Sequence, residues 1–233
     1  MTDIGFDVLG DLYLKPHDSF NWEGKATSLY CLLTGNISND VRTLVQTLSH
    51  LARFYQGVFF VPGTLEFSDL DISPGERTVQ LQSIAMQIPN VCMLYHHVAI
   101  IDGVGIVGVN GWNGAGDIDT ISNMTHTAAR FEDISYLNKS ISKLQKHLDV
   151  KKIIVVSNAI PNEKLYFGNI PEIVSEQVSL DITLNSDTES KVSSWVFGSI
   201  DKFVETTIDN INYISNPYTF QNPYWAKRIS ISV

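Results

Sequence analysis

Short apolar runs alternate with stretches of helical periodicity along most of this chain. Each run is followed by Gly, Asn, Asp or Pro, or ends at one, which is typical of buried strands that stop at a turn. Strands are therefore expected at residues 6–9, 28–33, 58–61, 91–94, 97–101, 104–109, 153–156, 195–198, 202–208, 211–215 and 228–233.

Three other stretches place apolar residues on one face of a helix. The first covers 41–52 and follows Asn39, a residue type that caps helix N-termini. The second begins at Ser73 or Pro74, because proline is favoured in the first helical turn. The third is expected at 134–148.

The order of these elements indicates the fold class. Asp102-Gly103 between two apolar runs predicts a hairpin turn, and the glycine-rich stretch 111–119 predicts a loop. Early strand–helix alternation followed by hairpins favours an α/β fold with mixed sheets. No repeat or linker divides the chain, so residues 1–233 are expected to form one domain, with an aromatic tail and final strand at 216–233.

Composition and charge exclude several classes of protein. The chain has 233 residues, a hydrophobic content of 44% and a net charge of −9, which describes a folded, acidic protein. Such a charge disfavours nucleic acid as a partner, because phosphate contacts need clustered Lys and Arg. Cys31 and Cys92 lie in apolar runs and are expected to be free thiols in a reducing compartment. With no signal-peptide pattern and no span of about 20 apolar residues, we expect a cytoplasmic protein that makes no membrane contact.

Five segments at the ends of apolar runs combine turn residues with polar side chains. Residues at such strand ends often converge on one site in an α/β fold. The segments are GDLYL (10–14), LLTGNIS (32–38), FVPGTLEF (60–67), VVSNAIP (155–161) and WVFGSID (195–201).

In this order, the segments resemble the motifs of the calcineurin-like metallophosphoesterases, over residues 6–224. The resemblance implies a β-sandwich of two mixed sheets flanked by helices, with two metals bound at the strand ends. Further likenesses are Trp112 in a glycine-then-Trp segment and the turn ISNPY at 214–218. Asp11 stands where the family has its first Asp, and Glu66 also matches the family.

Most of the positions that the resemblance assigns to ligands carry other residue types here. Asn36 replaces the Asp that bridges the metals, and Leu65 replaces the catalytic His. A neutral amide offsets no repulsion between two cations, and hydroxyls and amides are poor ligands beside imidazole. The degenerate site comprises Asp11, Tyr13, Asn36, Thr64, Leu65, Asn158, Ser199 and Asp201.

We therefore expect no catalytic residue, no cofactor and no metal. The remaining option is a single, weakly bound divalent cation, because Mg²⁺ and Ca²⁺ accept oxygen ligands. Its candidate ligands are Asp11, Asn36, Asn158 and Asp201. Asp11 has a second interpretation, in which its carboxylate accepts backbone N–H bonds in a turn.

Histidines elsewhere in the chain offer no obvious replacement for the missing ligands. His96 and His97 are neighbours in sequence, but adjacent residues of a strand point to opposite faces. We expect them not to bind one metal. His126 follows the glycine-rich stretch and is the one that could approach the site.

These residues favour a catalytically inactive phosphoesterase-fold protein that acts as a binding, scaffold or assembly module. It would have a protein partner, with homo-oligomerisation left open, and the aromatic tail either binds that partner or packs on the sandwich. The alternative is a divergent metal-dependent phosphoesterase with weak activity on phosphodiesters or nucleotides. Because the family is common in bacteriophage genomes, the resemblance also admits a phage structural or host-interaction protein, located in the cytoplasm or the virion.

Overall fold

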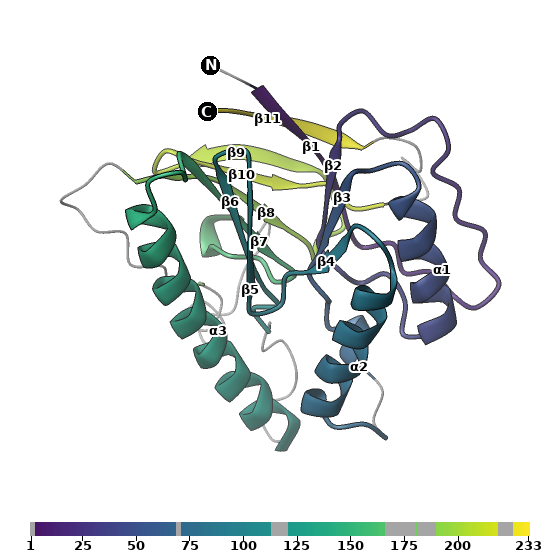
Figure 1. Ribbon diagram of the computed structural model, residues 1–233. Coiled ribbons are helices and arrows are strands. Elements are labelled where there is room, and N and C mark those ends of the chain that lie inside the picture. Colours follow the sequence, from purple (N-terminus) through teal and green to yellow (C-terminus); the bar gives the residue numbers. More distant parts are fainter. Residues whose placement is uncertain (1–2, 69–70, 113–120, 166–179, 181–189, 219–225) are drawn as a thin grey trace.

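The protein folds into four layers, with two β-sheets packed face to face and helices on both outer sides (Figure 1). The computed structural model describes residues 3–68, 71–112, 121–165, 180, 190–218 and 226–233. The predicted α/β sandwich of two mixed sheets is confirmed. None of the helices in these ranges is long and apolar enough to cross a membrane.

The first sheet has five strands, of which only the edge strand next to the N-terminal strand runs antiparallel to its neighbour. The other four strands run parallel to one another, and a helix lies in the second and the third of the connections between them. In spatial order the strands are β11 (Lys227–Ser232), β1 (Asp3–Leu9), β2 (Tyr30–Leu33), β3 (Gly57–Phe60) and β4 (Val91–Met93).

The second sheet has a parallel centre and two antiparallel edges. The turn at Asp102-Gly103 joins its first two strands, and both residues have positive φ, as the predicted hairpin requires. In spatial order the strands are β5 (His97–Ile101), β6 (Val104–Val109), β7 (Lys152–Ser157), β8 (Val192–Phe197), β10 (Ile211–Ser215) and β9 (Val204–Ile208).

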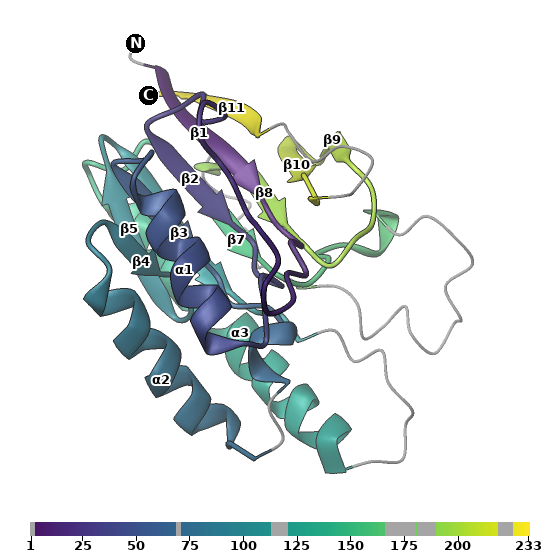
Figure 2. The ribbon, with the colours of Figure 1, turned by 90° about the vertical axis from the view of Figure 1, so that its right-hand side faces the viewer.

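The helices α1 (Val41–Ala52) and α2 (Pro74–Gln87) cover the first sheet (Figure 2). The expected cap of α1 is wrong by one residue, since the carboxylate of Asp40 accepts the Thr43 N–H at 2.7 Å while Asn39 precedes it. Ser73 caps α2 as expected and forms a capping box with Glu76.

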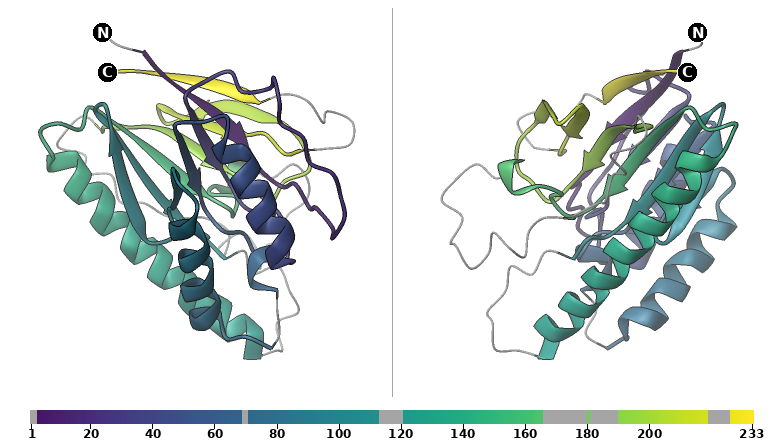
Figure 3. Two further views of the ribbon diagram at one scale, coloured as in Figure 1. Left: turned by 45° about the vertical axis from the view of Figure 1, so that its right-hand side comes forward. Right: turned by 90° about the vertical axis from the view of Figure 1, so that its left-hand side faces the viewer.

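The helix α3 (Ile121–Lys146) lies along the outer face of the second sheet (Figure 3). It begins earlier than the apolar pattern predicts, because its first turns precede the stripe that packs on the sheet. It also ends before Leu148, which is exposed and is not part of the buried face. Apolar periodicity detects the part of a helix that packs through apolar side chains, and it misses the preceding turns, where the buried side chains Arg130 and Asp133 are polar. Two short 3₁₀ turns complete the described elements, η1 (Leu65–Phe67) and η2 (Glu163–Leu165).

Three apolar clusters hold the layers together. The central cluster joins the inner faces of the two sheets, with Phe6 and Val8 from β1 against Ile106 and Ile154 from the second sheet. Each of the other two lies between one sheet and its helices. Cys31 is buried in the cluster under α1 and α2, and like Cys92 it is a free thiol.

The parallel strands of both sheets end at one common edge. The residues after β1, β2 and β3 and those after β7 and β8 are drawn together there, because backbone bonds tie one segment to the next. The Asp11 N–H donates to the Gly35 carbonyl at 3.0 Å, and the Gly198 N–H donates to the Ser157 carbonyl at 3.2 Å. This edge carries the candidate site.

Candidate functional site

The five motif segments meet at this edge, so residues that are far apart in sequence become neighbours. Hydrogen bonds link Asp11, Asn36 and Thr64 from the first sheet with Asn158 and Ser199 from the second. These residues were predicted from the sequence to share one site, and the structure brings them together.

The side-chain amide of Asn36 lies at the centre of this network. Its Nδ2 donates to Asp11 Oδ1 at 2.9 Å and to the Ser199 hydroxyl at 3.3 Å. Its Oδ1 accepts the Leu65 N–H at 3.1 Å. The amide thus bridges the two sheets with both of its polar atoms occupied. Nδ2 also lies within donating distance of the Tyr13 hydroxyl oxygen, at 3.3 Å.

Asn158, which follows a strand of the second sheet, also uses both polar atoms of its side-chain amide in hydrogen bonds. Its Nδ2 donates to the Thr34 carbonyl at 2.7 Å. Its Oδ1 accepts from the Ser199 hydroxyl at 3.0 Å and from the Thr64 N–H at 3.3 Å. Both amide oxygens of the site therefore face hydrogen-bond donors.

Asp11 carries a buried carboxyl group, with 2% of its surface exposed. Oδ1 accepts from Asn36 and from the Ser199 N–H at 3.1 Å, whereas Oδ2 is buried without a hydrogen-bond partner among the described residues. Burial raises the pKa of this carboxyl to about 6, and the hydrogen bonds from Asn36 and the N–H groups of Ser199 and Ile200 oppose the rise. Of the two N–H groups, that of Ser199 makes a well-formed hydrogen bond.

Tyr13 lies beside this carboxyl, half exposed to solvent. Partial burial raises the pKa of its phenol to about 12, and the charges of Asp11 and Glu66 add to the rise. The phenol therefore keeps its proton at neutral pH and remains a hydrogen-bond donor.

Glu66 supports the site from beneath and is completely buried. Its carboxylate accepts four backbone N–H groups, those of Gly63, Asn36, Ile37 and Ser38, at 2.6–3.0 Å. Burial raises its pKa to about 7, against the lowering effect of those donors. A protonated carboxyl would direct its own O–H at one of these four donors, so the hydrogen bonds favour the ionised form of Glu66. The resemblance in sequence marked Glu66 as a position that matches the family, and its role in holding the backbone is visible only in the structure.

The backbone of the site is strained at several residues. Asp11, Tyr13, Asn36 and Ser199 all have positive φ, between 47° and 56°. Each costs on the order of 1 kcal/mol in a residue with a Cβ atom, and such conformations concentrate at functional sites. Gly63 is required for a different reason, because a Cβ there would collide with the Asn36 side chain and backbone.

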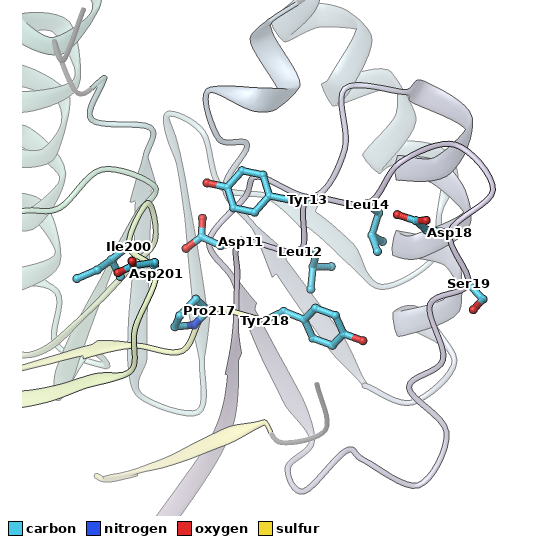
Figure 4. A pocket seen from close by; sticks show the side chains of 10 residues that line it. All are labelled: Asp11, Leu12, Tyr13, Leu14, Asp18, Ser19, Ile200, Asp201, Pro217 and Tyr218. Atoms are coloured by element: carbon cyan, nitrogen blue, oxygen red, sulfur yellow. The ribbon is translucent and has the colours of Figure 1, made fainter. Parts of the chain in front are cut away.

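Asp201 is exposed and stands outside this network, so the set of four oxygen ligands considered from the sequence does not form one hydrogen-bonded cluster. It lines an adjacent cavity of about 460 Å³ (Figure 4). The other lining residues are Asp11, Leu12, Tyr13, Leu14, Asp18, Ser19, Ile200, Pro217 and Tyr218. Apart from Asp11, Tyr13 and Asp201, none of them was a candidate, because loop and tail residues give no periodic signal that relates them to a strand end.

The histidines form no replacement site among the residues that the structure describes. That part of the chain contains no group of three or more His, Cys, Asp and Glu side chains placed to hold one metal ion. His96 instead contacts Asp133 of α3 at 2.6 Å and stacks between Tyr95 and Tyr136. His97 is exposed, and the side chain of His126 lies outside the described residues.

The two smaller likenesses to the family have structural roles next to the site. Asn216 of the ISNPY turn donates to the Val8 carbonyl at 2.9 Å, which fixes the segment that brings Tyr218 to the cavity. Trp112 is buried against Phe67. Of the aromatic tail, residues 219–225 lie outside the described residues.

Comparison with solved structures shows a metallophosphoesterase-like fold. The phosphopantetheinyl hydrolase from Mycobacterium tuberculosis superposes with a TM-score of 0.65 and 13% identity, over 97% of this chain and 96% of that one. GAP50, the anchor in the inner membrane complex of Plasmodium, superposes with a TM-score of 0.54 and 13% identity, over 91% of this chain and 71% of that one. No family model and no curated protein matches the sequence. At these identities the likeness defines the fold alone.

Proposed function

We propose that this protein is a catalytically inactive member of the phosphoesterase fold that acts as a binding or assembly module. One observation carries the proposal: the amides of Asn36 and Asn158 use their oxygens to accept hydrogen bonds from within the site. The polar atoms at the strand ends thus stabilise one another, and little is left to bind a reacting group.

The donor set does not fit a pair of metal ions. A binuclear centre needs a bridging anion, yet the group nearest the Asp11 carboxylate is the Nδ2 atom of Asn36, whose protons repel a cation. Turning the amide over would place its oxygen against Asp11 Oδ1 and its protons against the Leu65 N–H. We therefore propose that the site holds no cofactor, and at most one weakly bound divalent cation at Asp11.

The two structural neighbours support such a role without assigning it. One is described as a hydrolase and the other as an anchor, so this fold serves in both kinds of protein. A protein partner, a homo-oligomer and a phage origin with a virion location remain predictions from the sequence.

Metal analysis and phosphodiester turnover test the proposal. Purified protein is analysed for bound transition metals, and hydrolysis of bis-p-nitrophenyl phosphate is followed with added Mn²⁺. We expect substoichiometric metal and the same background rate for wild type, Asp11→Ala and the exposed control Asp149→Ala. Stoichiometric metal together with turnover that Asp11→Ala abolishes would overturn the proposal.

The same experiment addresses the alternative, a divergent phosphoesterase. The unpartnered Oδ2 of Asp11, on a carboxyl with a pKa of about 6, is the observation that favours it, since such a group could act as a general base. Turnover that needs Asp11 and follows its ionisation would select this alternative.

A further inference from the structure

The cavity beside the site presents negative charge and apolar surface together. Among the described residues, the charged side chains that line it are all carboxylates, those of Asp11, Asp18 and Asp201, and no Lys, Arg or His lines it. The chain as a whole carries a net charge of −9. A cavity of this kind attracts cations and repels phosphate groups.

One of the residues that line the cavity has a carboxylate oxygen without a hydrogen-bond partner in the described part of the chain. Asp11 lines the cavity while being almost wholly buried, and its Oδ2 has no hydrogen-bond partner among the described residues. Burying a carboxylate oxygen without a hydrogen bond lowers the stability of the folded protein. The negative charge of this buried carboxylate attracts a cationic group of a ligand at this end of the cavity.

The arrangement of the lining favours an elongated ligand over a metal ion. In Figure 4, Asp11 and Asp201 lie on one side of the cavity and Asp18 on the other, with Leu12 and Tyr218 between them. The carboxylates do not converge on one point, which agrees with the lack of a three-ligand cluster in the described part of the chain. A metal ion needs several oxygens around a single position.

The surface between the carboxylates is suited to an alkyl chain. Leu12, Leu14, Ile200 and Pro217 supply apolar contacts, and the Tyr13 and Tyr218 rings can contact a cation through their faces. The volume of about 460 Å³ lies in the range of small-molecule sites. At the far end, one oxygen of Asp18 accepts the Lys15 N–H at 2.7 Å, which holds that loop in place.

We propose that this cavity binds an alkylammonium group, with the ammonium at Asp11 and Asp201 and the alkyl chain over Leu12 and Tyr218. The group can belong to a free diamine or to a lysine side chain of a protein partner, and the chemistry recognised is the same. This inference rests on the proposed binding role and specifies its ligand.

Calorimetric titration of the intact chain tests the inference. The probes are 1,5-diaminopentane, 1-aminopentane, Nα-acetyl-lysine methylamide and the neutral isostere 1-pentanol. We expect the amines to bind and 1-pentanol not to bind. A tighter complex with the diamine indicates a free polyamine as the source, and a tighter complex with the lysine derivative indicates a partner's side chain.

Two variants and a matched control locate the binding. Asp11→Asn is expected to weaken amine binding by about tenfold, because it removes the buried charge, and Asp201→Asn by less, because Asp201 is exposed and exposed charge pairs are weak. Asp149→Asn makes the same change of charge near the opposite end of β7 and should leave the affinity unchanged. Circular dichroism verifies that each variant is folded.

The inference would be overturned by equal amine affinity in wild type and Asp11→Asn, by binding of 1-pentanol as tight as that of 1-aminopentane, or by Mg²⁺ binding at Asp11 without amine binding. Its failure is distinguishable from failure of the proposed function. Metal-dependent turnover contradicts the inactive module, whereas absent amine binding without turnover contradicts the ligand assignment alone.

Discussion

The Nδ2 atom of Asn36 lies 2.9 Å from Oδ1 of Asp11, so an amide proton occupies the space beside this buried carboxylate. This contact joins the turns after β1 and β2. It also sets the electrostatic character of the site, because a hydrogen-bond donor takes the position where a second acid would create a cation site.

Asn36→Asp is expected to convert the contact into a pair of carboxylates. Repulsion between two acids at this separation should lower the free energy of unfolding by about 2–4 kcal/mol at neutral pH. Mn²⁺ should restore part of this loss in the variant and have little effect on the wild type. Urea denaturation with and without Mn²⁺ measures both effects. Asn210→Asp, in the exposed turn between β9 and β10, is the matched control, and equal responses to Mn²⁺ in wild type and Asn36→Asp would contradict the prediction.

Asp11→Asn should stabilise the protein at neutral pH. Burial raises the folded-state pKa of Asp11 from 3.8 to about 6, so between these values the folded protein binds a proton that the unfolded chain has released. Stability therefore falls as pH rises through this window, and the variant lacks that fall. Above pH 6 the variant should be more stable by about 2–3 kcal/mol, and below pH 4 the two should be nearly equal.

Urea denaturation of both proteins across this pH range is the measurement. Other groups, including Glu66, titrate in both proteins, so the difference between the two curves isolates Asp11. A difference that stays constant with pH would show that burial of the charge is not the cause.

Glu66→Gln should destabilise the fold. The amide would turn an –NH₂ group toward backbone N–H donors that now share a carboxylate, which leaves two of the four without an acceptor. We expect a loss of about 2–4 kcal/mol, at the usual scale for unsatisfied buried donors. Glu163→Gln on the exposed turn η2 is the control, and similar urea midpoints for the two variants would refute the supporting role of Glu66.

Gly63→Ala should disturb the site through steric collision. A Cβ at this position would meet the Asn36 side chain and the Asn158 amide, and neither has free space behind it. Overpacking of this kind costs about 1–3 kcal/mol. Gly75→Ala is the control, because a Cβ there meets nothing within 4 Å and alanine favours the helix α2. Thermal melts should move in opposite directions, and a Gly63→Ala protein as stable as the wild type would contradict the predicted clash.

Local patterns predicted the framework of the fold where one physical requirement dominates. Asp102-Gly103 predicted its hairpin because both turn residues need positive φ, and Ser73 predicted the start of α2 because its hydroxyl caps the helix. The cap of α1 was misplaced because Asn39 and Asp40 are both good caps, and only the three-dimensional position of the Thr43 N–H decides between them.

The site was predictable to the extent that it lies in strand-end motifs. Asp11, Asn36 and Asn158 were found through their place in such motifs, but the direction of each amide depends on partners that are remote in sequence. Tyr218 is remote from Asp11 in sequence, and Asp18 lies in an irregular loop. Only the folded chain brings both of them to one cavity with Asp11.

The pairing of β11 with β1 has a consequence for synthesis of the chain on the ribosome. Asp3 lies opposite Ser232, so β1 receives this neighbour only after β11 has also been synthesised. Until then β1, which carries the buried Phe6 and Val8, has one unpaired edge. Such an edge can recruit another nascent chain. Translation products that stop between Tyr218 and Lys227 should therefore aggregate, even though they contain the described residues of the candidate site.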